Sequence, residues 1–239
     1  QKIHIGSEDE LGRLATAFNT MSDALQSEDE RRKEFLANVS HELRTPISYI
    51  QGYSEALLDD VVTTEEQEKK YLRLIRREAG RMERLVRDLL DLATLEGDSP
   101  MQCTALPFAQ LIVEVVETLS PLLEAKQQRV ELKLDPDVIV IGDPDRLEQV
   151  IHNLLTNANR YTPAGGHISI QLFQKGEQAI LQVQDTGIGI PEADLPRIGE
   201  RFFRVDKGRS REGGGTGLGL AIVKQIVFRH HGRLKIESE

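Results

Sequence analysis

The stretch 64–97, TEEQEKKYLRLIRREAGRMERLVRDLLDLATLEG, predicts one long amphipathic helix. Thr64 suits the N-cap position, and Gln67 completes a capping box with it. Gly97 follows the last apolar position, where a helix commonly stops. Between these limits apolar residues recur at alternating spacings of three and four, which is the seam of a coiled coil. The seam consists of Leu72, Ile75, Ala79, Met82, Val86, Leu89 and Ala93.

The segment upstream shows the same pattern and predicts a second helix. Its seam opens with Leu11, Leu14, Phe18, Met21 and Leu25. The run Ser27–Glu34 has no apolar residue and interrupts the seam, which resumes at Phe35 and reaches Leu57. Two long helices joined by a short acidic turn form a helical hairpin. Because one hairpin buries two seams poorly, we expect two copies to form a dimeric four-helix bundle. The alternative is a hairpin that packs against the C-terminal part of the chain.

The composition excludes several classes of protein. The 239 residues include 30 Lys and Arg against 39 Asp and Glu, a formal net charge of −9. Such an acidic chain repels phosphates overall, which argues against general binding to nucleic acids or anionic membranes. The single Cys103 permits no intramolecular disulfide and fits a reducing compartment. Because no apolar run approaches the ~20 residues of a membrane-spanning helix, we expect the chain to be soluble.

Residues 106–239 differ from the hairpin, because short strand-like runs alternate with helical ones and most of the glycines lie here. Strands are expected over residues 129–134, 138–141, 167–174 and 179–185. Helices are expected over 144–159, with Asp143 as the cap, and over 218–230. Residues 98–105 suit a linker. This order predicts an α+β two-layer sandwich in which helices cover one face of a mixed sheet.

Residues 35–46, FLANVSHELRTP, place one histidine on the outside of the first helix. At ~100° per residue the apolar positions from Val39 onward share one face, and His41 points the opposite way. A lone surface histidine is usually idle. Here Glu42 can hydrogen-bond one ring nitrogen and make the other a better nucleophile. Thr45 lies one turn further on, where its hydroxyl can orient a water molecule.

Pro46 removes a backbone donor in mid-helix and should bend or loosen the helix near His41. The segment resembles the H-box of sensor histidine kinases, whose pattern is His-Glu-x-x-Thr followed by Pro. The resemblance implies that His41 is the phosphoacceptor and Glu42 the base that activates it. It also implies that Thr45 assists dephosphorylation of a partner response regulator. We expect that regulator to be recognised below His41, by Ser48, Gln51, Gly52, Glu55 and Tyr71.

Residues 152–162, HNLLTNANRYT, put Asn153, Asn157 and Arg160 on one helical face. An amide oxygen suits a phosphate-bound Mg²⁺, and a cation one turn later suits the phosphates themselves. The plain alternative is a polar outer face. The segment resembles the N-box of the same kinase family, which implies that Asn157 is the magnesium ligand. Asn153, Arg160 and Tyr161 then belong to the nucleotide site.

Two glycine-rich segments follow. In DTGIGI, residues 185–190, the glycines let the backbone approach a flat ligand, although many hairpin turns look alike. The segment resembles the G1 box, which implies that Asp185 binds the adenine amino group beside Gly187 and Gly189. GGGTGLGL, residues 213–220, offers free N–H groups and a helix dipole to phosphate, or is simply a flexible loop. It resembles the G2 box, which assigns Gly215, Thr216, Gly217, Leu218 and Gly219 to the nucleotide.

A loop of about 25 residues separates the two boxes, and long loops of this kind are commonly lids. Its basic residues can close on triphosphate, or they form a solvated surface. They are Arg201, Arg204, Lys207, Arg209 and Arg211. The family usually has an aromatic residue where Gly199 stands, and a lysine where Arg160 stands. The first departure affects how the lid docks, whereas the second keeps the charge.

The resemblance covers nearly the whole chain. Residues 1–26 are similar to the end of a HAMP signal-relay module, and 27–97 to a dimerisation and histidine phosphotransfer domain. After the linker 98–105, residues 106–239 are similar to an ATP-binding domain of GHKL type. The resemblance implies ATP with Mg²⁺, autophosphorylation of His41, transfer to an aspartate of a response regulator, and phosphatase activity towards that regulator. No nucleic-acid partner is expected.

Alternatives come from two other classes. A GHKL ATPase of chaperone or DNA-repair type resembles this nucleotide site, but it carries a glutamate where Asn153 stands. A non-catalytic dimeric relay module would use nucleotide only to change shape. For the kinase, we expect a membrane anchor and a sensor upstream of this segment, a cytoplasmic location in a bacterium, and another strand after Glu239.

Overall fold

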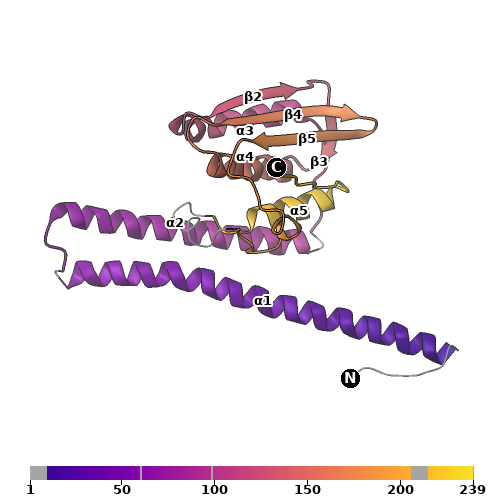
Figure 1. Ribbon diagram of the computed structural model, residues 1–239, viewed down its shortest axis with the longest axis horizontal. Coiled ribbons are helices and arrows are strands. Elements are labelled where there is room, and N and C mark those ends of the chain that lie inside the picture. Colours follow the sequence, from indigo (N-terminus) through magenta and orange to yellow (C-terminus); the bar gives the residue numbers. More distant parts are fainter. Residues whose placement is uncertain (1–9, 60, 98, 206–214, 239) are drawn as a thin grey trace. The chain divides into compact units, whose positions relative to one another are not determined.

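The computed structural model describes residues 10–59, 61–97, 99–205 and 215–238 (Figure 1). Helix α1 comprises Glu10–Leu58, and helix α2 comprises Glu65–Glu96. The chain divides into two compact units, residues 1–82 and 83–239, and the division falls inside α2. None of the described helices is both long enough and apolar enough to cross a membrane.

The predicted helical hairpin is confirmed by α1 and α2. The backbone N–H of Gln67 donates to Thr64 Oγ1 over 3.3 Å, which makes Thr64 the N-cap of α2. Helix α1 continues through the polar run 27–34 and through Pro46. The polar run therefore interrupts the apolar seam but not the helix, and an i,i+4 ion pair between Lys33 and Asp29 at 2.5 Å supports it.

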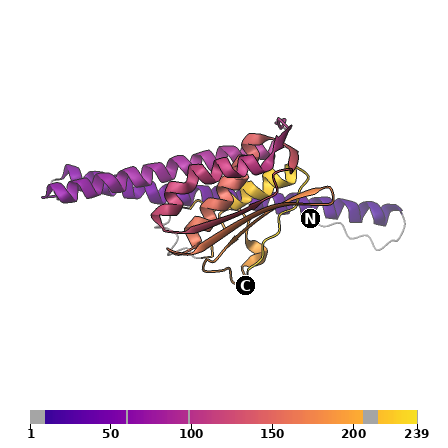
Figure 2. The same ribbon diagram turned by 90° about the horizontal axis from the view of Figure 1, so that it is seen from above.

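The second unit contains a mixed sheet with helices on one face, as predicted (Figure 1; Figure 2). Its three strands are β2 (Arg129–Leu134), β4 (His167–Lys175) and β5 (Gln178–Asp185). Strand β2 pairs with β4 in parallel, and β4 pairs with β5 antiparallel. A separate antiparallel pair joins β1 (Thr104–Pro107) to β3 (Ile139–Gly142). Strand β1 therefore begins inside the segment that the sequence marks as a linker.

Three longer helices complete the unit: α3 (Phe108–Ala125), α4 (Pro144–Tyr161) and α5 (Gly219–Arg229). A short 3₁₀ turn, η1, covers Leu195–Arg197. Helices α4 and α5 were expected, whereas α3 was not predicted from the sequence. Its run of β-branched residues and its internal Pro121 weaken the helical signal, and burial of one face against the sheet stabilises the helix instead.

The core of this unit lies between α3, α4 and the sheet. Apolar side chains from each element are buried together. They include Ile112, Val115, Leu119 and Leu123 of α3, Ile151, Leu155 and Ala158 of α4, and Ile168, Ile170 and Leu172 of β4. Fully burying one Val, Leu or Ile side chain contributes about 1.5–3 kcal/mol. The core therefore fixes which face of α4 points away from the sheet.

The C-terminal end of α4 is held by the turn that follows α3. Gln127 has φ +53°, a left-handed conformation that ends α3 with the hydrogen bonds of a Schellman motif. The turn directs Lys126 Nζ to the carbonyl oxygen of Arg160 at 3.1 Å and Gln128 Nε2 to that of Thr162 at 2.7 Å. A cation on the last carbonyls of a helix is favoured by the helix dipole, so this end of α4 is both capped and fixed in place.

Asp143 fixes the other end of α4, and its replacement should weaken this unit. One carboxylate oxygen accepts from the Arg146 N–H at 3.3 Å and the other from the Gln102 N–H at 3.0 Å. We expect Asp143→Ala to lower the free energy of unfolding by about 1 kcal/mol, measured by urea denaturation. Asp143→Asn retains an acceptor and should lose less; equal losses in the two variants would contradict the capping role.

Candidate functional site

His41 projects from α1 as the helical periodicity predicts. Its side chain is exposed, whereas the next residue, Glu42, is half-buried on the face of α1 that contacts α2 within residues 1–82. The Thr45 hydroxyl lies one turn on and donates to the backbone carbonyl of His41 over 3.3 Å. The described contacts include no hydrogen bond between the His41 ring and Glu42.

The Glu42 carboxylate is bound by a residue that sequence reasoning missed. Arg81 Nη2 of α2 donates to Glu42 Oε2 over 2.7 Å, and the Arg81 side chain is only 10% exposed. Hydrogen bonds between two ionised groups are the strong ones, above all when water is excluded. Arg81 is thus the direct partner of a residue in the H-box.

The predicted amide and cation of α4 lie beside the start of α5. A Cβ added at Gly219 would lie 3.3 Å from Asn153 Oδ1, and one added at Gly215 would lie 2.1 Å from Arg160 Nη1. Asn153, Asn157 and Arg160 are all partly exposed. The structure therefore brings the N-box segment and the G2-box segment together, although they are about 60 residues apart in sequence.

The segment after β5 contacts the same end of α4. Asp185 Oδ1 accepts the Gly187 N–H at 2.8 Å, and the Ile188 N–H points at the Tyr161 carbonyl at 3.4 Å. A Cβ at Gly187 would lie 2.4 Å from Asp185 Oδ1 and 2.9 Å from the Tyr161 carbonyl oxygen. Only a residue without a side chain fits this approach. Asp185 itself is exposed.

The G2-box segment is held by backbone and side-chain contacts. The Phe202 N–H donates to the Gly217 carbonyl at 3.0 Å, and Leu218 is fully buried at the start of α5. Gly199 has φ +90°, a conformation that an aromatic residue rarely adopts. Arg204 is half-buried, while Lys207, Arg209 and Arg211 lie outside the described residues. The predicted lid is therefore described only as far as Val205.

Thr216 of the G2-box segment has a partner from α2, within the unit 83–239. Its hydroxyl lies 2.6 Å from Asp88 Oδ2 and also accepts the Leu218 N–H at 3.2 Å. Burial raises the pKa of Asp88, and nearby Asp91 adds to the increase. The Thr216 hydrogen bond opposes it, as do the charges of Arg84 and Arg87. After Arg81, Asp88 is the second residue whose contact with a motif segment was not predicted from the sequence.

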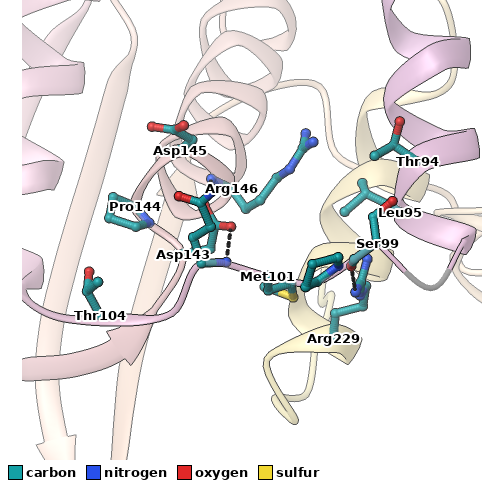
Figure 3. A pocket seen from close by; sticks show the side chains of 12 residues that line it. Thr94, Leu95, Ser99, Met101, Thr104, Asp143, Pro144, Asp145, Arg146 and Arg229 are labelled. Atoms are coloured by element: carbon teal, nitrogen blue, oxygen red, sulfur yellow. Dashed lines mark hydrogen bonds between the residues drawn. The ribbon is translucent and has the colours of Figure 1, made fainter.

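A pocket of about 520 Å³ opens near the start of α4, away from the predicted nucleotide residues. Figure 3 shows Asp143, Asp145 and Arg146 on one side and Thr94, Leu95 and Arg229 on the other. Arg229 donates to the Ser99 carbonyl at its edge. None of the residues predicted to bind nucleotide lines this pocket.

Within the described residues, no group of three or more His, Cys, Asp or Glu is arranged to hold a metal ion. The donor that the sequence predicts is the Asn157 amide, which is partly exposed on α4. A single amide oxygen suits a magnesium ion that takes its other ligands from phosphates and water.

Three family descriptions match this chain. Residues 142–239 match the histidine kinase-, DNA gyrase B- and HSP90-like ATPase family. Residues 31–98 match the His Kinase A phosphoacceptor domain, and residues 1–27 match the HAMP domain.

Similar proteins are sensor kinases. The phosphate regulon sensor protein PhoR of Pseudomonas aeruginosa is 43% identical over 88% of this chain and 48% of its own length. The sensor histidine kinase WalK of Bacillus subtilis is 37% identical over 96% of this chain and 38% of its own. The chain thus spans about half or less of these relatives.

Two solved structures share the fold. The Acinetobacter baumannii histidine kinase AdeS has a TM-score of 0.63 and 29% identity, over 79% of this chain and 86% of that one. Histidine kinase ThkA in complex with the response regulator protein TrrA has a TM-score of 0.69 and 26% identity, over 87% and 60%.

Gly187→Ala should weaken ATP binding, because the added methyl collides with the Tyr161 carbonyl and with Asp185. We expect the Kd for ATP, measured by calorimetry, to rise at least about tenfold, or 1.4 kcal/mol. Gly176→Asn is the control: the position has φ +62° and open space around it, and asparagine tolerates that conformation. Unchanged ATP affinity in Gly187→Ala would show that this loop is not part of the nucleotide site.

Asp88→Asn should stabilise the protein at neutral pH. A folded-state pKa above the unfolded value of about 3.9 means that the protonated form favours folding. That contribution is present below the unfolded pKa and is lost as pH rises through the folded value. The amide stays neutral and can still accept from Thr216. We expect the Tm gain of the variant, measured by calorimetry, to grow from about pH 4 to pH 7; a gain independent of pH would contradict the assignment.

Proposed function

Because this chain belongs to the sensor histidine kinases, we propose that it transfers the γ-phosphoryl group of ATP to His41. The phosphoryl group then passes to an aspartate of a separate response regulator. The proposal rests on two observations. In one unit His41 is exposed and Glu42 follows it in the sequence. In the other unit the residues predicted to bind nucleotide lie together around α4 and the start of α5.

The first step forms a bond between a ring nitrogen of His41 and the γ-phosphorus, while the bond from that phosphorus to the ADP oxygen breaks. The ring proton goes to the Glu42 carboxylate. In the second step the nitrogen–phosphorus bond breaks, and a regulator aspartate oxygen takes the phosphoryl group. Thr45, one turn from His41, assists the later hydrolysis on the regulator by orienting water.

Different residues of the predicted nucleotide site bind different parts of ATP. Asp185 accepts from the adenine amino group, and Arg160 and the N–H groups of residues 215–219 bind phosphate oxygens. Asn157 would hold Mg²⁺, which when bound offsets negative charge on the transferring group. Asn153 lies beside Gly219, where it can orient the same phosphates.

The hairpin provides the surface for a second copy. On this single chain Leu72 is 51% exposed and Val86 is 45% exposed, and Ala79 and Ala93 of the same seam are also exposed. Covering these residues in a four-helix bundle would remove apolar surface from water. The exposed residues Ser48, Gln51 and Glu55 support regulator docking on α1 below His41. The HAMP match supports a place for this segment in a membrane-anchored sensor.

Two alternatives make different products. A GHKL ATPase would release phosphate without labelling itself, and a relay module would bind nucleotide and form neither product. Asn153 favours the kinase, because an amide is not a base that can activate water for hydrolysis.

His41→Gln should abolish self-labelling by γ-labelled ATP. Wild-type protein is expected to carry an acid-labile, base-stable label, and the variant at least about 100-fold less, because the nucleophile is gone. His231→Asn is the control, since this exposed histidine has φ +58°, which asparagine tolerates. A label that survives in His41→Gln would contradict the assignment, and steady phosphate release without any label would favour the ATPase.

A further inference from the structure

The contact between Glu42 and Arg81 ties the H-box to α2. One guanidinium nitrogen lies 2.7 Å from Glu42 Oε2, and the side chains are 10% and 31% exposed for Arg81 and Glu42. Glu42 faces α2 while His41 faces solvent. In this structure the carboxylate is therefore bound to the arginine, and the described contacts include none between it and the His41 ring.

A second carboxylate stands next to Arg81 on its own helix. Glu78 lies three residues earlier, which makes the two side chains neighbours on the helix surface. Its side chain is only 7% exposed, and Arg77 donates to Oε1 at 3.1 Å. Its other oxygen, Oε2, is buried without a hydrogen-bond partner among the described residues. Burying a carboxylate oxygen without a hydrogen bond costs free energy. A second donor to Glu78 would therefore stabilise the protein.

We propose that Arg81 positions the base of the kinase reaction by exchanging between two carboxylates. Paired with Glu42, as in this structure, it holds that carboxylate against α2 and away from the His41 ring. Paired with Glu78, it satisfies the orphaned oxygen and releases Glu42 to take the ring proton. This inference rests on the proposed function, because Glu42 acts as a base only if His41 is phosphorylated.

The exchange needs no net change in charge. One arginine serves two carboxylates that are about one helical turn apart, so a small rotation or slide of α2 against α1 is enough to exchange partners. In both states Arg81 keeps an ion pair. The difference in free energy between the states can therefore be small, which is the requirement for a switch that a signal can bias.

The test measures single-turnover autophosphorylation at saturating ATP, together with the Kd for ATP. Glu78→Gln is isosteric and removes the negative charge of the second carboxylate, so Arg81 stays paired with the charged Glu42. We expect the rate to fall about tenfold, the change produced if Glu42 is free one-tenth as often, with unchanged ATP affinity. Adding Arg81→Met to this variant should restore the rate, because nothing then holds Glu42. In a Glu42→Gln background neither change should matter.

A merely structural role for Glu78 and Arg81 predicts the opposite pattern, because the double variant would be slower than Glu78→Gln alone. That result, or an unchanged rate in Glu78→Gln, overturns the exchange. Arg81→Gln replaces Arg81→Met if the latter does not fold, and Arg76→Met, at an exposed arginine of α2, is the matched control. A wild-type protein without any label would overturn the proposed function as well, whereas a labelled wild type without the rescue overturns only this inference.

Discussion

The arrangement of the predicted nucleotide site depends on the burial of one face of α4. Ile151 and Leu155 are almost completely buried against α3 and the sheet, so α4 has only one rotation about its axis that keeps the core filled. That rotation turns Asn153 and Arg160 toward the start of α5. The capping by Asp143 at one end, and by Lys126 at the other, then fixes the helix along its axis. The same helix therefore contributes to the core and fixes the positions of the side chains that are predicted to bind nucleotide.

Helix α2 also contributes to two parts of the molecule, in its case through charged side chains rather than apolar packing. In residues 1–82 it contributes Arg81, which binds Glu42, and in residues 83–239 it contributes Asp88, which binds Thr216. Burying a charge costs free energy that a partner offsets at least in part. Each of these charges has a partner in a motif segment, so this helix holds side chains of the H-box and of the G2 box through single, specific hydrogen bonds.

Much of the fold could be predicted because its signals are local. Thr64 and Asp143 cap helices with their own side chains, and the alternating residues of β4 and β5 define strands without reference to distant segments. Helix α3 could not be predicted in this way. Its β-branched residues suit a strand as well as a helix, and the choice between them is made by burial against β4 and α4, which no local pattern contains.

For the candidate site, the residue types and their spacing were enough to predict the participants: His41 on an exposed helix face, the amides of α4 and the glycines that leave room for a ligand. Spacing along a helix decides which residues share a face, and glycine permits a close approach wherever it stands. Only the tertiary structure decided that Arg160 meets Gly215, that Arg81 binds Glu42 and that Asp88 binds Thr216. The sequence of a helix does not show which of its charged residues has a partner. That depends on packing between segments that lie far apart in the chain.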